Sequence, residues 1–111
     1  MDIPQIQEVL QAYCVSTFPE WAGGEVTDLR QISTGWESDV YAFDLLHGSP
    51  QARAREALIL RIYPAQDAYE KAAREFDALV RLYRCGYPVP EALAMEREAP
   101  VFGQPFMLMR R

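Results

Sequence analysis

One charged residue interrupts the most apolar segment of the chain. Arg61 lies within Leu58–Tyr63, and a guanidinium that loses water there needs a carboxylate or a phosphate as its partner. An arginine on the solvent side of a sheet would need neither, so both possibilities stay open. Glu75 adjoins the apolar stripe of a predicted helix and could meet Arg61. A solvated glutamate paired with a neighbouring arginine is the commoner arrangement.

A short polar loop, Ile32–Tyr41, lies between two predicted strands. Backbone amides hold a phosphate chain well where no bulky side chain obstructs them, and Thr34, Gly35 and Ser38 permit such an approach. A single glycine in a hairpin more often serves the turn geometry alone. The loop, the strand cation and the helix acid nevertheless follow one another as in the kinase signature, in which an ion pair places a cation against nucleotide phosphates.

Two helices are expected to help position these residues. Asp2 can cap a first helix that opens with Pro4 and ends near Phe18, with apolar residues at steps of three and four. A longer helix with the same period is predicted over residues 67–85, and Gly86 can provide its left-handed cap.

Five segments have the composition of β-strands: 26–32, 39–46, 57–63, 92–95 and 105–109. The third is densely apolar, which predicts a central position in the sheet. The second is expected to stop at His47, a turn residue followed by a polar stretch through Arg55, and a turn through Glu98–Pro100 joins the last two. The fold class is therefore α+β, a five-stranded antiparallel sheet with a long covering helix and an extra N-terminal helix.

The composition of the chain limits the kinds of partner that it can bind. The chain has 111 residues, which predicts a single domain, 1–111, around one core. Its net charge is -5 and its basic residues are scattered, so no face offers the positive field that nucleic acid requires. Neither a signal peptide nor a membrane-spanning run is visible, and we expect a cytoplasmic protein without a membrane partner.

Several stretches together resemble the aminoglycoside phosphotransferase and choline kinase-like family, which has the protein-kinase-like fold. They are Gly35–Tyr41, Leu58–Arg61, Arg74–Phe76 with Ala78–Leu79, Gly86–Pro90 and Pro105–Met109. Their spacing matches the family along nearly the whole chain. The resemblance covers the N-terminal, nucleotide-binding lobe of such an enzyme, and it implies that the chain is truncated at the hinge between the lobes.

The resemblance also implies which residues contact the nucleotide phosphates. A flap over the phosphates would be formed by Thr34, Gly35, Trp36, Glu37, Ser38 and Asp39. Arg61 would occupy the phosphate-contacting position that the family usually gives to lysine, and Glu75 would orient it. A planar guanidinium is not equivalent to an ammonium, so this contact would differ in geometry.

The base would be held by the strands and the hinge. By the same resemblance, Val40 and Ile59 would sandwich the adenine ring. The hinge, whose backbone reads the adenine edge, would begin with Met109, Arg110 and Arg111. The implied cofactor is ATP with Mg. The family's catalytic base and metal ligands belong to a helical lobe after the hinge, so this chain alone is expected to hold no catalytic residue and no metal ligand, and to be inactive.

The complete enzyme would transfer the γ-phosphate to a hydroxyl of an aminoglycoside-, choline- or sugar-like acceptor. An alternative is a free-standing kinase-lobe-like domain for protein interaction or dimerisation, without catalysis. A third possibility, a plain α+β module, predicts that Arg61 and Glu75 point apart. Self-association is also expected, because an isolated lobe would leave its last strand and hinge face uncovered.

Overall fold

The computed structural model describes residues 2–34, 38–64, 66–97 and 101–111. The elements follow the predicted order of a helix, three strands, a long helix and two strands. They are α1 (Ile3–Thr17), the short 3-10 helix η1 (Pro19–Trp21), β1 (Glu25–Thr34), β2 (Asp39–Ser49), β3 (Ala52–Ile62), α2 (Gln66–Arg84), β4 (Ala92–Glu96) and β5 (Phe106–Arg110). No helix of these described residues combines the length and the apolar character needed to cross a membrane.

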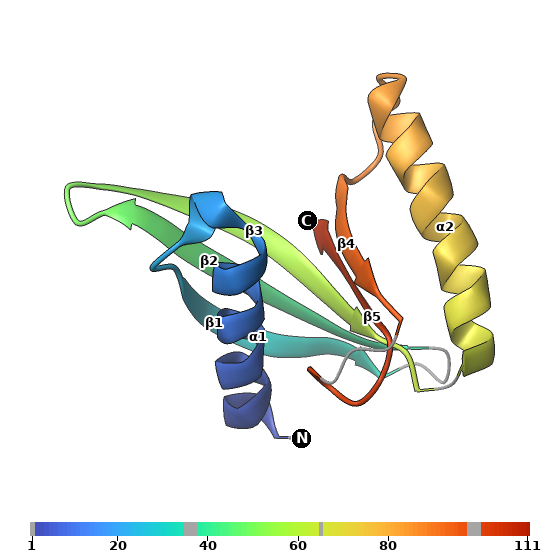
Figure 1. The fold of residues 1–111 in the computed structure, drawn as a ribbon, viewed down its shortest axis with the longest axis horizontal. Coiled ribbons are helices and arrows are strands. Elements are labelled where there is room, and N and C mark those ends of the chain that lie inside the picture. The colour runs from blue at the N-terminus through green and yellow to red at the C-terminus, as the bar shows by residue number, and fades with distance from the viewer. Residues whose placement is uncertain (1, 35–37, 65, 98–100) are drawn as a thin grey trace.

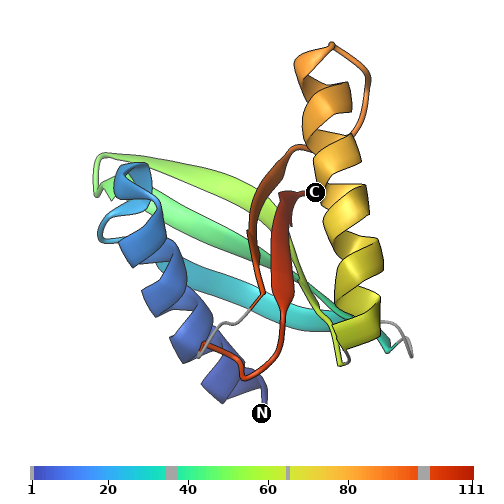
Figure 2. The same ribbon diagram turned by 45° about the vertical axis from the view of Figure 1, so that its right-hand side comes forward.

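The strands form one five-stranded sheet in the order β1-β2-β3-β5-β4, and every neighbouring pair is antiparallel. This confirms the predicted α+β fold class and the central position of β3. Figure 1 shows α1 lying across the strands, and α2 running beside β4. In the turned view of Figure 2, α1 and α2 lie on either side of the sheet.

Asp2 caps α1 as predicted, and the structure adds a capping box with Gln5. The Asp2 side chain accepts a hydrogen bond from the Gln5 backbone N–H, and the Gln5 side chain accepts one from the Asp2 backbone, both at 2.9 Å. Ile6, Leu10 and Cys14 form the buried face of the helix. Burial raises the pKa of the Cys14 thiol to about 12, so the thiol stays protonated within the core.

The main core lies between α1 and the sheet. Every second residue of β2 and β3 points into it, since successive strand residues face opposite sides. Its largest fully buried side chains include Phe43, Phe106, Leu10, Leu45, Leu58, Leu60 and Leu108. A smaller cluster of Tyr63, Ala72 and Met107 lies on the other face, under α2.

The β2–β3 hairpin is longer than predicted. His47 belongs to β2, and β3 begins at Ala52, so the expected strand end at His47 and the expected polar connection through Arg55 are wrong. The ladder continues to a pair between Ser49 and Ala52. Gly48 is required near that end, because its φ is +102 and a Cβ there would lie 2.6 Å from the Ala52 carbonyl oxygen. Polar residues remain in the ladder because this part of the hairpin extends past α1, as Figure 1 shows.

Strand β1 is an edge strand with an irregular register. Its pairing with β2 shifts between Thr27 and Arg30, and again between Gln31 and Ser33. Asp28, within the first shift, has a φ of 55, in the left-handed region that few non-glycine residues adopt. Its carboxylate accepts a hydrogen bond from the Arg30 guanidinium at 2.7 Å. Such bulges bend and twist a strand locally.

Helix α2 is followed by Gly86 with a φ of +85, the predicted left-handed cap. Its apolar stripe is only partly covered. Ala72 is buried and Phe76 packs against the cluster beneath the helix, whereas Tyr83 is 47% exposed. The C-terminal half of α2 therefore presents apolar surface to solvent.

Candidate functional site

Arg61 lies on the face of the sheet opposite α1. Leu60 and Ile62 enter the main core, so the alternate residues Ile59 and Arg61, together with Tyr63 directly after β3, face the other way. Because β3 is the central strand, this arrangement places a cation in the middle of the less covered face.

The Arg61 guanidinium has an unsatisfied donor. Among the described residues, its Nε and the Tyr63 hydroxyl are buried without any hydrogen-bond partner. Leaving a buried donor without a partner costs about 1–3 kcal/mol. Desolvation raises the pKa of Tyr63 to about 12; the charge of Arg61 acts against this rise and that of Glu75 adds to it. The phenol therefore stays protonated at neutral pH, and two donors without partners lie buried on this face.

Arg61 and Glu75 share a neighbourhood without forming an ion pair. Both charges act on the Tyr63 hydroxyl, which places them near the same face of the sheet. The ion pairs of the described residues do not include one between them, and Glu75 is exposed on α2. The Arg61 charge is therefore not compensated by Glu75 at contact distance.

An apolar strip borders Arg61 on the same face. In the ladder, Ile59 pairs with Ala42 on one side and with Met109 on the other, and Val40 pairs with Arg61. Directly paired residues place their side chains on one face. Val40 and Ile59 are only half-buried, so apolar surface remains accessible beside the cation.

The predicted flap is described only at its two ends. Thr34 pairs with Asp39, where β1 and β2 come together, and Ser38 is buried. The central flap residues Gly35, Trp36 and Glu37 lie outside the described residues.

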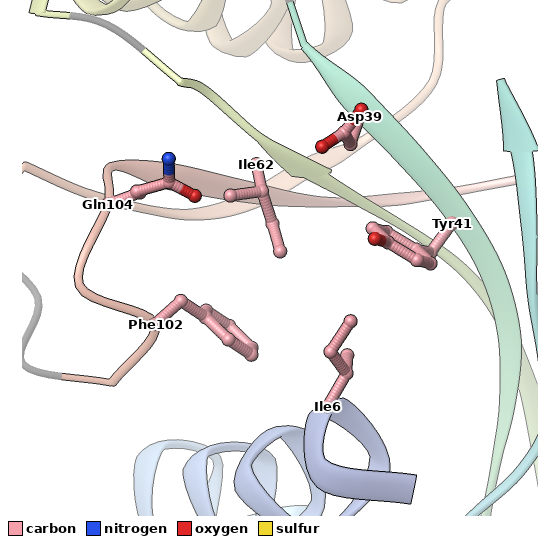
Figure 3. A pocket seen from close by; sticks show the side chains of 6 residues that line it. All are labelled: Ile6, Asp39, Tyr41, Ile62, Phe102 and Gln104. Carbon is pink, nitrogen blue, oxygen red and sulfur yellow. The ribbon is translucent and has the colours of Figure 1, made fainter. Parts of the chain in front are cut away.

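Asp39 faces away from Arg61. It adjoins Val40, and successive strand residues point to opposite sides. Its side chain lines a cavity on the α1 face together with Ile6 and Tyr41 (Figure 3). Of the two residues that follow the buried Ser38, Val40 therefore joins the Arg61 face and Asp39 does not.

Arg111, which the resemblance assigns to the hinge, is held by a buried carboxylate. Its guanidinium donates to Asp44 Oδ1 at 2.5 Å and to the Phe43 carbonyl oxygen at 3.2 Å. Arg55 approaches the other carboxylate oxygen, with 3.1 Å between its Nε and Asp44 Oδ2. The Asp44 side chain is only 8% exposed, so this ion pair is screened less than a surface one.

Arg110 is anchored on the opposite face of the sheet. Its guanidinium donates to Glu56 and, at 2.9 Å, to Glu91 Oε1. The hydrogen bond that Arg110 donates to Glu56 raises the pKa of Arg110. A hydrogen bond from His47, followed by the one from Arg110, holds the pKa of Glu56 below its usual range. His47 is thus a strand residue with a carboxylate partner and not the predicted turn residue.

Sequence reasoning missed the carboxylates that hold Arg110 and Arg111, namely Asp44, Glu56 and Glu91. Asp44 carried a signal, because it stands alone in the apolar run of β2 just as Arg61 does in β3. No such signal marked Glu56 or Glu91, because each lies in a polar part of the sequence. Among the described residues there is no group of three or more His, Cys, Asp or Glu side chains that could hold a metal ion.

Comparison with known proteins agrees with this architecture. Residues 28–111 match the model of the phosphotransferase enzyme family, and this stretch includes all five strands except the start of β1. A comparison with curated proteins gave no match. The family match confirms the resemblance drawn from the sequence, and the sheet with its two helices is consistent with the N-terminal lobe of a kinase-like fold. The chain belongs to the phosphotransferase enzyme family.

Proposed function

We propose that this chain is the nucleotide-binding lobe of an ATP-dependent small-molecule phosphotransferase. The observation that carries the proposal is the buried Nε of Arg61, which has no partner among the described residues and stands beside an accessible apolar strip. A phosphate oxygen would satisfy that donor and compensate the charge, since guanidinium and phosphate form charge-assisted hydrogen bonds. The membership of this chain in the phosphotransferase enzyme family also supports a role in nucleotide binding.

In this proposal, the residues on the Arg61 face of the sheet have separate roles in binding the nucleotide. Arg61 would donate to a nucleotide phosphate, and the protonated Tyr63 hydroxyl, unpartnered in the described residues, could donate beside it. Glu75 would orient the guanidinium only if the helix or the side chains moved, because the two do not form an ion pair. The flap residues Thr34–Asp39 would cover the phosphates, with the Asp39 carboxylate turned to the opposite face.

The base would rest against the apolar strip. Val40 and Ile59 lie on the same face, so they would contact one side of an adenine ring and would not enclose it from both sides. The ion pair between Arg111 and Asp44 would hold the first hinge residues close to that strip. A chain so arranged binds and orients a nucleotide.

Catalysis would need residues beyond these. In this proposal the complete enzyme transfers the γ-phosphate of ATP to a hydroxyl of an aminoglycoside-, choline- or sugar-like acceptor. Mg, when bound, would neutralise phosphate charge during transfer. The described residues contribute binding and orientation, and we propose that the 111-residue chain is inactive by itself.

The test is a titration with ATP, ADP and adenosine, followed by the amide signals of the ¹⁵N-labelled chain. Replacing Arg61 by Ala should weaken ATP binding roughly tenfold to a hundredfold, because a hydrogen bond to a charged group is worth about 1.5–3 kcal/mol. Adenosine, which has no phosphate, should bind both proteins equally. Arg74→Ala removes an exposed charge of the same kind from α2 and should leave ATP binding unchanged. Equal ATP affinity in R61A and wild type would contradict the proposal.

A second candidate, a domain for self-association, is favoured by the exposed apolar residues of α2 and of the segment after it. They are Leu82, Tyr83 and Tyr87, exposed by 36%, 47% and 59%. Sedimentation velocity over a range of concentrations tests it. A dimer that dissociates in Tyr83→Ser with Tyr87→Ser supports this candidate, and a monomer at every concentration removes it.

A further inference from the structure

A second cavity lies on the face of the sheet opposite Arg61. Figure 3 shows six side chains around it, with Asp39 and Tyr41 of β2 on one side, Gln104 and Phe102 across from them, and Ile6 of α1 below. Its volume is about 140 Å³, and it is lined by Ile6, Asp39, Tyr41, Ile62, Phe102 and Gln104. It shares no lining residue with the apolar strip or with Arg61, and of the residues in the proposed nucleotide site it shares only Asp39, at the end of the flap.

The cavity carries one uncompensated negative charge. Asp39 forms no ion pair among the described residues, whereas the sheet carboxylates Asp44 and Glu56, and Glu91 before β4, each do. Its charge reaches the Tyr41 hydroxyl, whose pKa is raised first by burial and then by Asp39. The Asp39 carboxylate can only accept hydrogen bonds, whereas the Tyr41 hydroxyl and the Gln104 amide can accept or donate them. The Asp39 charge therefore disfavours an anion here and favours a donor with positive charge.

Three of the lining side chains are apolar, although polar atoms make up the larger part of the accessible lining. Ile6, Ile62 and Phe102 supply carbon surface, and Tyr41 supplies a second ring. A cation near an aromatic face gains about 0.5–2 kcal/mol from the ring. Such walls suit an organic cation better than a hydrated metal ion, which needs several oxygen ligands.

The size restricts the occupant further. Water takes about 30 Å³ per molecule in the liquid, so the cavity has room for roughly four or five non-hydrogen atoms. We propose that this cavity binds a small organic ammonium ion, with the ammonium group at the Asp39 carboxylate and the Tyr41 hydroxyl and its carbon atoms against Ile6, Ile62 and Phe102. The site does not depend on the nucleotide proposal, because it lies on the other face of the sheet.

The test uses ethylammonium chloride as the probe, added to the ¹⁵N-labelled 111-residue chain at constant ionic strength against sodium chloride. The amide signals of Tyr41, Ile62, Phe102 and Gln104 should shift and saturate together. Ethanol, a neutral molecule with the same carbon chain, should produce no saturating shifts at the same concentrations. Saturation with ethanol, or shifts that stay linear with ethylammonium, would overturn the proposal.

Two matched variants locate the charge that binds. Asp39→Asn keeps the shape of the side chain and should weaken ethylammonium binding by at least about tenfold, because a charge-assisted hydrogen bond is lost. Asp77→Asn removes an equal charge from the exposed surface of α2 and should bind the probe as wild type does. The thermal unfolding midpoint of each variant reports whether the fold is intact. An intact D39N protein with unchanged affinity would refute the assignment of Asp39.

Discussion

The two faces of the sheet differ in how completely they are covered. On the α1 face, Phe43, Leu58 and Leu60 have no exposed surface. On the other face, Val40 and Ile59 are half-buried, and Arg61 leaves a buried donor without a partner in the described residues. The covered face gains the free energy of burial, about 25 cal/mol per Å² of apolar area. The other face gives up part of that gain, because apolar surface stays partly exposed and the Arg61 donor stays without a partner in the described residues.

The largest effect should come from truncating the covered face. Phe43→Ala removes a fully buried ring and should lower the free energy of unfolding by about 3–5 kcal/mol. Ile59→Ala, on the neighbouring strand but on the open face, should cost about 1 kcal/mol, because less surface returns to water. Urea denaturation of both variants measures the difference. Equal losses would show that the two faces are packed alike.

A smaller loss is expected at Asp44, the buried carboxylate that holds Arg111. Asp44→Ala leaves Arg111 without its buried partner and should cost about 1–3 kcal/mol. The matched control is Glu70→Ala, which breaks an ion pair with Arg97 whose side chains are 60% and 56% exposed. That pair should contribute no more than about 1 kcal/mol. If both variants unfold at the same denaturant concentration, the buried ion pair of Asp44 is no more stabilising than the exposed pair.

A substitution of Arg61 should affect stability and ATP binding in opposite ways. Arg61→Met fills the same space with an apolar side chain and removes the unsatisfied Nε, so stability should stay unchanged or rise by about 1 kcal/mol. ATP binding should fall in the same variant. A destabilised R61M protein would mean that the guanidinium belongs to the structural face, and the comparison between the faces would then fail. Thermal unfolding and the nucleotide titration measure the two quantities.

The smallest effect is a pH dependence on the α1 face. The hydrogen bond from His47, and then that from Arg110, holds the pKa of Glu56 below its ordinary value. Its stabilising contribution is therefore complete above the usual carboxyl pKa of about 4.3, and is lost as the pH falls through the lower pKa of the folded state. The gap in melting temperature between wild type and Glu56→Gln should be widest above about pH 5 and should close below it. A gap that stays constant to pH 3 would contradict this assignment.

The order and type of the elements could be predicted because they follow from local periodicity. The turn residues Asp2 and Gly86 also marked the correct helix ends. The predicted β2–β3 hairpin was too short. Strands are recognised in a sequence by their pattern of buried apolar residues, and residues 52–55 are exposed. The extension is held by ladder hydrogen bonds, which leave no signature in side-chain polarity.

The site was only partly predictable for a different reason. The place of Arg61 on a strand followed from its isolation among apolar residues, and strict alternation could have placed Asp39 on the opposite face from Val40. The partner of Arg111 could not be inferred, since Asp44 lies 67 residues earlier in the chain. Long-range pairs of this kind depend on the strand order and on the register of β2, β3 and β5, which single-sequence patterns do not specify.

The bulges of β1 have a consequence for the behaviour of the protein in concentrated solution. An outer strand with a regular row of free amides and carbonyls is a template on which another chain can add a strand, and this is a common first step toward fibrils. In β1 the register shifts twice, and Asp28 takes a left-handed conformation with its charge and that of Arg30 on the rim. A straight incoming strand cannot match that contour, so β1 is protected against growth by strand addition.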